Sequence, residues 1–285
     1  MKKTTDLGTT GAGTSRGFTR FLTIFTLLSR IPVKRRFEAD FSRADFWIPA
    51  LSPLVSLAAL AGFGAGMTLT GSFFLAALSS VAVQYFLFNL FHLDGLVDSA
   101  DALLPVASRE RRLEILKDPR LGTYGFFCGL LVLSARIGAM RILAEEGVYF
   151  TFLAASLLAA PAAGRAAAAL IALKLAPTRP NGLGSLMKGF SATRIALGSL
   201  IAFAPAFAFS WIAGSWLLAI IIAASTTLAA ILAAFAVGRA YKTALGGFTG
   251  DALGAAIEIG ELLVLILSAI VLKQLGAAVL WPIGV

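Results

Sequence analysis

The chain has 285 residues, of which 58% are hydrophobic and 14% are charged, and its mean hydropathy is +0.87. This balance excludes an ordinary soluble domain and indicates a membrane protein. The net charge of +9 is explained by basic loops and by attraction to anionic headgroups, so no nucleic-acid partner is expected.

A short tail and a short helix precede the long apolar runs. The Thr/Gly-rich residues 1–17 are predicted to form a disordered tail. The stretch Phe18–Ile31 is too short and too basic for a membrane span. We therefore expect an interfacial or re-entrant helix there, and whether it crosses the bilayer stays open.

Longer apolar runs then approach the roughly 20 residues that a transmembrane helix needs. They are Phe46–Leu69, Phe73–Phe91, Tyr124–Leu143, Val148–Leu173, Ile195–Ala213, Trp216–Val237 and Ala255–Leu275. The predicted fold is an all-α, polytopic integral membrane bundle of about seven transmembrane helices. Residues 18–285 are predicted to form a single transmembrane domain.

Basic residues alternate from loop to loop. Lys and Arg accumulate before the first run and after the second, fourth and sixth runs, whereas the turns near Thr70 and Gly214 carry none. Because basic loops stay in the cytoplasm, we expect a multi-pass cell (inner) membrane protein whose motif-bearing regions face the cytoplasm.

The first motif, His92–Asp101, follows the second apolar run and contains the only histidine. Its acids Asp94, Asp98 and Asp101 are spaced i, i+4 and i+7, so a helix places all three carboxylates on one face. Unpaired like charges at the edge of a membrane core are costly. The spacing therefore suggests that a hard metal ion lies among them.

The second motif, Glu110–Gly125, is amphipathic and ends its helix at a proline. Glu114 and Asp118 form an i, i+4 acidic pair within it. Gly122 and the final glycine open the next span, where helix-start amides can bind a phosphate.

The third motif is a glycine-rich loop near Lys188, and Arg165 lies inside the span before it. An arginine within a membrane needs a partner. It either pairs with an acid or reaches a substrate phosphate, or it snorkels or forms a structural ion pair.

The fourth motif is a glycine-rich loop that leads into a helix at Asp251. Glu258 and Glu261 follow at i+7 and i+10, which repeats the acidic pattern of the first motif. Acids are scarce in this chain, which favours a functional role. In the alternative, Asp251 caps the helix and the glutamates pair with Arg165 or Arg136.

Together the motifs resemble the cobalamin-5'-phosphate synthase family, also called adenosylcobinamide-GDP ribazoletransferases. The matching segments occur in family order and cover almost the whole chain: Phe25–Pro32, His92–Asp101, Glu114–Gly125, Gly182–Gly184 and Gly246–Glu258. The chain departs from the family pattern at Asn89, Ala102 and Pro119, but no departure removes a carboxylate.

The resemblance implies a magnesium-dependent transferase of late cobalamin biosynthesis. The ribose hydroxyl of α-ribazole, or of its 5'-phosphate, attacks the cobinamide-side phosphorus of adenosylcobinamide-GDP, and GMP leaves. Carboxylate-held Mg²⁺ suits such a displacement. The implied metal ligands are Asp94, Asp98 and Asp101, completed by Asp251 and by Glu258 or Asp118.

Other roles follow from the same resemblance. His92 is a candidate general base, and Asp94 or Asp98 is the alternative. The candidate substrate-binding residues are Glu114, Lys117, Arg120, Gly122, Arg165, Gly184, Lys188, Gly247, Thr249 and Gly250. The choice of acceptor, the number of metal ions and assembly into a homo-oligomer stay open.

Two other functions are alternatives to this transferase. A CDP-alcohol phosphotransferase-like enzyme also uses an aspartate-rich helix and magnesium, but its motif spacing does not match Asp94–Asp101. A cation-coupled transporter would bind ions near the bilayer midplane. In this chain the acids cluster at helix ends, which favours a transferase open to a soluble nucleotide.

Overall fold

A computed structural model describes residues 16–145, 150–178, 183–186, 189–213 and 215–280 of the chain. These residues fold into α-helices joined by short loops, with one π-helical turn, η1 (Tyr85–Asn89), and one 3₁₀ turn, η3 (Leu183–Leu186). The helices are α1 (Arg16–Leu28), α2 (Ala44–Ala50), α3 (Ser52–Thr70), α4 (Phe73–Gln84), α5 (Leu90–Leu103), α6 (Arg109–Ile115), α7 (Thr123–Glu145), α8 (Phe150–Lys174), α9 (Ala192–Ile212), α10 (Trp216–Leu245) and α11 (Gly250–Leu280).

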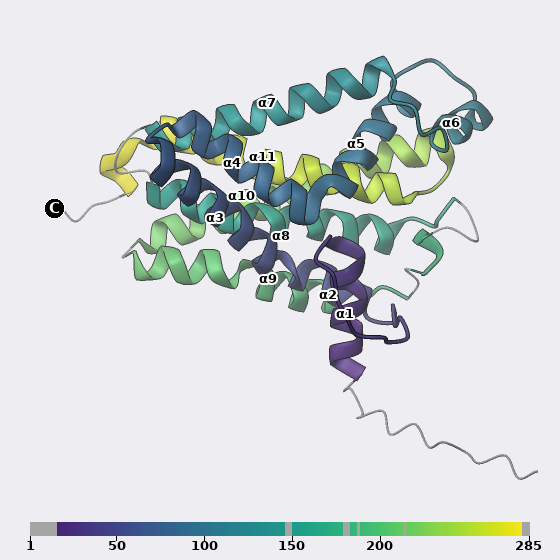
Figure 1. Ribbon diagram of the computed structural model, residues 1–285, viewed down its shortest axis with the longest axis horizontal. Coiled ribbons are helices and arrows are strands. Elements are labelled where there is room, and N and C mark those ends of the chain that lie inside the picture. Colours follow the sequence, from purple (N-terminus) through teal and green to yellow (C-terminus); the bar gives the residue numbers. More distant parts are fainter. Residues whose placement is uncertain (1–15, 146–149, 179–182, 187–188, 214, 281–285) are drawn as a thin grey trace, which may run out of the picture.

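Among the described residues, six helical segments are long and apolar enough to cross a membrane, and the α4–α5 pair makes a seventh if its two bent arms form one span. The prediction of an all-α bundle with about seven spans and a short amino-terminal helix is confirmed. The long helices run roughly side by side, and α1 lies across their direction (Figure 1).

Two boundaries differ from the prediction. Helix α1 begins at Arg16, so the predicted tail is too long by two residues, and residues 1–15 lie outside the described part. The run Phe73–Phe91 is not one straight helix, because α4 and α5 meet at a bend of 93°.

The bend has a local cause in the π-helical turn Tyr85–Asn89. With 12 residues, α4 extends only about 18 Å, which is too short for a bilayer core of about 30 Å. Within the π-helical turn, the carbonyl of Leu87 accepts a hydrogen bond from the backbone N–H of Arg30 at 2.8 Å. Turns of this kind commonly mark a break in a helix. The motif helix α5 is therefore the second arm of a bent helix pair.

The centre of the bundle is a close crossing of α8 and α11. An added Cβ at Gly164 would lie 2.4 Å from the carbonyl oxygen of Ile257, and one at Gly260 would lie 2.8 Å from the Cα of Gly164. Only glycine fits such an approach, and small residues are the usual means of close helix contact in membranes.

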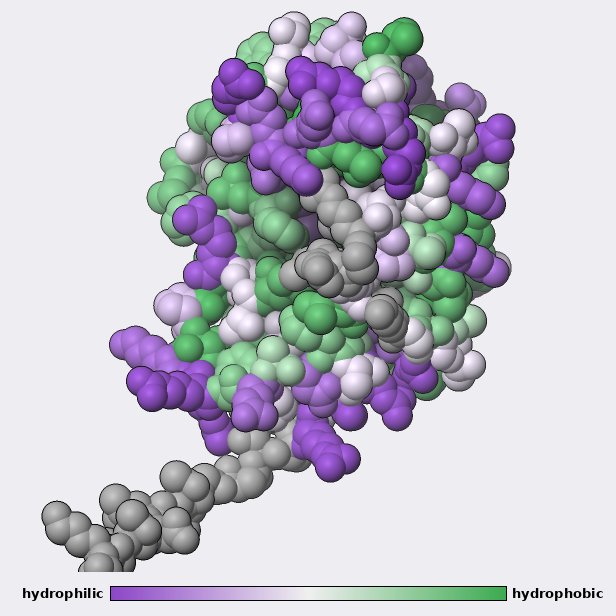
Figure 2. Space-filling view, turned by 90° about the vertical axis from the view of Figure 1, so that its right-hand side faces the viewer, coloured by the Kyte–Doolittle hydropathy of each residue, from purple (hydrophilic) through white to green (hydrophobic). Residues whose placement is uncertain are grey.

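The four motifs gather at one end of the bundle, which we call the motif end. It comprises the end of α5, helix α6, the starts of α7 and α11 and the loop after α8, on the right in Figure 1. Figure 2 looks onto this end and shows hydrophilic side chains gathered at its top and along its lower edge, with apolar side chains between them. Its exposure to the cytoplasm stays a prediction.

We expect Gly164→Ala to destabilise the protein, because the new methyl group would force α8 and α11 apart. Overpacking of this kind costs about 1–3 kcal/mol, which thermal unfolding in detergent would measure. Gly138→Ala on α7 is the matched control, since its Cβ would meet no atom within 4 Å. Equal stability of the two variants would contradict the proposed tight crossing.

Candidate active site

The first and fourth motifs pack directly against each other. An added Cβ at Gly95 would lie 3.0 Å from the Cα of Asp251, and one at Gly254 would lie 2.9 Å from the carbonyl oxygen of His92. These two glycines allow α5 to approach the first turn of α11. The contact brings Asp251 beside the aspartates of the first motif.

The carboxylates form a negatively charged group on this contact. Asp94 is exposed, whereas Asp98, Asp101 and Asp251 are partly buried. Asp98 lies within electrostatic range of the other three. Within the described part of the chain, neither Asp94 nor Asp98 forms a salt bridge. Such uncompensated negative charge attracts a cation.

Asp101 forms a contact that its spacing did not predict. Its Oδ2 accepts the N–H of Gly122 and its Oδ1 accepts the N–H of Gly125, each at 2.8 Å. Asp101 thus satisfies two amides of the first turn of α7, as a capping carboxylate does. The amides that we expected to face a phosphate face this carboxylate.

Both glycines are required by this cap. An added Cβ would lie 2.3 Å from an oxygen of Asp101 at Gly122 and 2.4 Å from one at Gly125. A single interaction therefore explains the last acid of the first motif and the glycines of the second.

The glycine-rich loop before α11 is held by the loop that follows α8. The N–H of Phe248 donates to the carbonyl of Ala176 at 3.0 Å, and the N–H of Thr178 donates to the carbonyl of Phe248 at 2.9 Å. Gly247 lies against the carbonyl of Ala176, and Gly184 lies against the ring of Phe248. Both predicted substrate-binding glycines thus have a packing role.

The same loop orients Asp251. The hydroxyl of Thr249 donates to Oδ2 of Asp251 at 3.0 Å, and the N–H of Ala252 donates to the Thr249 oxygen at 3.4 Å. Gly250, the first residue of α11, has open space where a side chain would begin.

Ser99 and Tyr241, which the sequence analysis did not single out, connect the helices next to the aspartates. The hydroxyls of Ser99 and Tyr241 lie 2.6 Å apart and are buried. Ser99 also lies 3.4 Å from the carbonyl of Asp251. This contact joins α5, α10 and α11, and the sequence gives no clear signal for it, since Tyr241 follows the apolar run Trp216–Val237.

A second polar group, which we call the buried ion cluster, lies deeper in the bundle. It consists of Gln84, Tyr85, Arg136, Arg165, Glu258 and Glu261, each at most 5% exposed. Arg136 pairs with Glu258 at 3.3 Å and with Glu261 at 2.8 Å. Arg165 pairs with the other oxygen of Glu261 at 2.8 Å.

Polar side chains complete the buried ion cluster. Gln84 donates to Glu261 at 2.6 Å and accepts from Arg136 at 3.0 Å, and Tyr85 donates to Glu258. The alternative in which the glutamates pair with Arg136 and Arg165 is therefore the arrangement found. Glu258 and Arg165 thus both have ion-pair partners within the buried ion cluster.

Comparisons with known proteins identify the family. The family model for cobalamin-5-phosphate synthase (CobS) matches residues 20–269. The chain belongs to this family. Proteins named adenosylcobinamide-GDP ribazoletransferase from Escherichia coli K12 and from Shigella flexneri are each 35% identical over 261 residues, 86% of this chain and 97% of the relative. No solved structure matches the chain.

His92 of this CobS-family chain lies inside the bundle. Its side chain is 1% exposed, and neither ring nitrogen has a hydrogen-bond partner among the described residues. The charges of Arg165 and Glu261 act on it, so it lies beside the buried ion cluster. This position favours an aspartate over His92 as the general base.

Charged residues of the second motif pair with near neighbours in the chain. Arg111 binds Glu114 at 3.0 Å, and Arg120 binds Asp118 at 2.5 Å. Hydrogen bonds from the side chain and backbone of Arg120 lower the pKa of Asp118 to about 2. Lys117 is exposed. Lys188 lies outside the described residues.

The shared metal site stays a prediction. Among the described residues, no three His, Cys, Asp or Glu side chains converge closely enough to hold a metal ion. Mg²⁺, however, commonly takes only one or two carboxylates and completes its shell with water and substrate phosphate. The exposed and partly buried pair Asp94 and Asp98, with Asp251 adjacent, fits that pattern of donors.

We expect Asp101→Asn to loosen the start of α7, because an amide side chain can accept only one of the two backbone hydrogen bonds. Loss of a cap costs about 0.5–2 kcal/mol. Hydrogen exchange should show faster exchange of the Gly122 and Gly125 amides, whereas Asp94→Asn should leave them unchanged. Unchanged protection in both variants would refute the capping role.

We expect Glu258→Gln to lower the free energy of unfolding by about 3–5 kcal/mol, because it removes one partner of a buried charge. Thermal unfolding in detergent would measure this. Glu145→Gln is the control, since the Arg141–Glu145 pair is exposed and such pairs contribute about 0–1 kcal/mol. An unchanged stability of Glu258→Gln would return Glu258 to the candidate metal ligands.

Proposed function

We propose that this protein is a membrane-bound adenosylcobinamide-GDP ribazoletransferase of late cobalamin biosynthesis. Two facts support the proposal: family membership across residues 20–269, and relatives of that name matched over 97% of their length. The observation that carries it is the meeting of Asp94, Asp98 and Asp251 at the motif end. There a soluble nucleotide and a membrane-held corrinoid can both reach the carboxylates.

We infer that Asp94 and Asp98, with Asp251 adjacent, supply the one or two carboxylates that a Mg²⁺ ion takes from a protein. A bound Mg²⁺ supplies charge neutralisation for the diphosphate and for the leaving phosphate. The donor chemistry fits, since these carboxylates are crowded and Asp94 and Asp98 have no salt-bridge partner among the described residues. Asp101 is left out because both of its oxygens accept backbone N–H groups, and Glu258 because it is ion-paired with buried Arg136.

The reaction then follows as an in-line displacement. The ribose hydroxyl of α-ribazole or its 5'-phosphate forms a new bond to the cobinamide-side phosphorus. The bond between that same phosphorus and the bridging oxygen breaks, and GMP leaves with the bridging oxygen. The proton of the attacking hydroxyl goes to Asp94 or Asp98, which lie at the surface of α5, whereas His92 is buried.

We propose that the protein lies in the cell (inner) membrane with its motif end in the cytoplasm. The loops at this end carry the excess of Lys and Arg, which is the usual sign of the cytoplasmic side. A nucleotide-linked substrate is available on that side. Assembly into a homo-oligomer is left open by this proposal.

A cation-coupled transporter receives less support. Such a protein needs acids near the bilayer midplane to bind its ion. The acids deepest in this bundle, Glu258 and Glu261, are matched by Arg136 and Arg165, so the four formal charges cancel.

The test is GMP release by purified protein in lipid vesicles supplied with adenosylcobinamide-GDP, α-ribazole 5'-phosphate and magnesium. Release should require both substrates and should stop with a chelator. We expect Asp98→Asn to lower the rate about 100-fold or more, because it removes a ligand charge and a proton acceptor. Stability should be retained, since the substitution relieves repulsion among like charges.

Glu145→Gln, at the opposite end of α7 from the motifs, should release GMP at the wild-type rate. No release by folded wild-type protein with both substrates and metal would overturn the proposed reaction. An Asp98→Asn variant with full rate and full magnesium affinity would remove Asp98 from the site and leave the reaction standing.

A further inference from the structure

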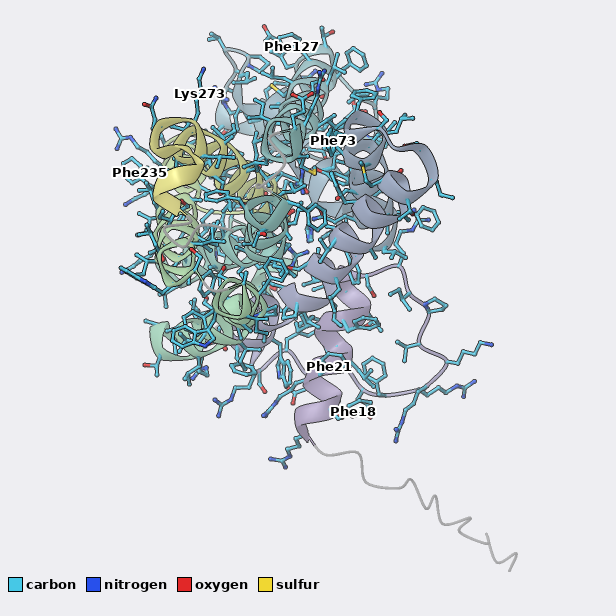
Figure 3. The ribbon with its side chains drawn as sticks, turned by 90° about the vertical axis from the view of Figure 1, so that its left-hand side faces the viewer. Phe18, Phe21, Phe73, Phe127, Phe235 and Lys273 are labelled. Atoms are coloured by element: carbon cyan, nitrogen blue, oxygen red, sulfur yellow. The ribbon has the colours of Figure 1, made fainter. Side chains whose placement is uncertain are left out.

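A groove of about 700 Å³ lies between α8 and α10 at their motif-end halves. Its walls are apolar and include Leu170, Ile171, Ile231 and Phe235. Phe235 is 66% exposed, and Figure 3 shows it on the outer flank of the bundle, pointing away from the other helices. The groove therefore opens on the side of the bundle, where a membrane protein meets lipid.

A glycine of α10 deepens this groove. The position of a Cβ on Gly238 is 3.6 Å from Ile171 and 3.8 Å from Leu175. The absence of a side chain leaves a channel between the two helices. The volume is within the roughly 300–1,000 Å³ of small-molecule sites.

Cations gather at the end of the groove. Lys174 on α8 and Arg239 and Lys242 on α10 line it, and all three are exposed. In the described part of the chain, none of the three forms a salt bridge. No acid is among the residues that line the groove. Three positive charges beside an apolar channel match a ligand with an anionic head and a hydrocarbon tail.

A second cavity, next to the groove, is also lined by basic residues. It measures about 650 Å³, lies on the other flank of α10 and shares Arg239 with the groove. Arg109 and Arg112 line it, but they donate hydrogen bonds to the carbonyls of Leu245 and Ala102. They hold helix ends, whereas the cations of the groove are available to a ligand.

We propose that the α8–α10 groove binds one anionic phospholipid. Its headgroup phosphate contacts Lys174, Arg239 and Lys242, and an acyl chain lies along Leu170 and Phe235. Basic pockets between transmembrane helices bind anionic headgroups in this way. A zwitterionic lipid has no net charge to offer the three cations and binds less well.

The bound lipid also supports the candidate active site. Lys174 lies two residues before Ala176, whose carbonyl accepts the N–H of Phe248, and the carbonyl of Lys242 accepts the N–H of Gly246. The groove thus ends on the two joined loops that hold Asp251. A lipid that clamps α8 to α10 stabilises this junction. This consequence rests on the proposed function, whereas lipid binding does not.

The experiment uses purified protein in mixed phosphatidylglycerol and phosphatidylcholine, with retained lipid identified by native mass spectrometry. Wild-type protein should retain phosphatidylglycerol preferentially. Each cation removed should weaken this binding about fivefold, so Arg239→Gln should reduce the preference and the triple variant with Lys174→Gln and Lys242→Gln should abolish it. Lys273→Gln, an exposed cation on α11 outside the groove, should not change it.

Several results would overturn the proposal. They are equal retention of the two lipids by wild-type protein, full preference in the triple variant, or loss of preference in Lys273→Gln. Displacement of phosphatidylglycerol by GDP would also overturn it, since the groove would then be a nucleotide site. Thermal unfolding in phosphatidylcholine alone should show that all variants fold. The binding readout needs no transferase activity, so it separates this proposal from the proposed reaction.

Discussion

The buried ion cluster is the constraint on which the rest of the structure depends. Charges inside a membrane bundle are costly unless each is paired. Arg136 on α7 and Arg165 on α8 meet both glutamates of α11. All of these pairs can form at once only when α7, α8 and α11 each have a fixed rotation about the helix axis and a fixed position along the membrane normal. Because Asp251 precedes Glu258 by seven residues, the same rotation sets Asp251 toward α5.

The bend at Tyr85–Asn89 joins this cluster to the candidate active site. Tyr85 and the neighbouring Gln84 bind the glutamates of α11, so the end of α4 is held in the core. The chain then turns by 93° into α5 and lays the first motif across the start of α11. The positive end of a helix dipole favours nearby anions, which helps the carboxylates to crowd there. Asp101 on α5 accepts backbone N–H groups at the start of α7 and so connects that helix to the same site.

Loops at the motif end therefore have structural and chemical tasks at once. The bridge between Ala176 and Phe248 places the loop of the fourth motif, and Thr249 orients Asp251. Glycines in these loops permit close backbone contact. The basic groove beside them connects the same junction to the surrounding lipid, so we expect the membrane to influence the site through α8 and α10.

The sequence alone determined the class of fold, because a bilayer imposes a length and a hydropathy on each span that are local properties. It also determined the family, through motifs such as His92–Asp101, and the crowding of carboxylates on one helix. Only the tertiary structure decided which acids stay available. Helical periodicity predicts that Glu258 lies on the same face of α11 as Asp251. Only the structure shows that Arg136 of α7 faces Glu258 and forms an ion pair with it. Likewise, Asp101 became a cap because α7 begins beside it.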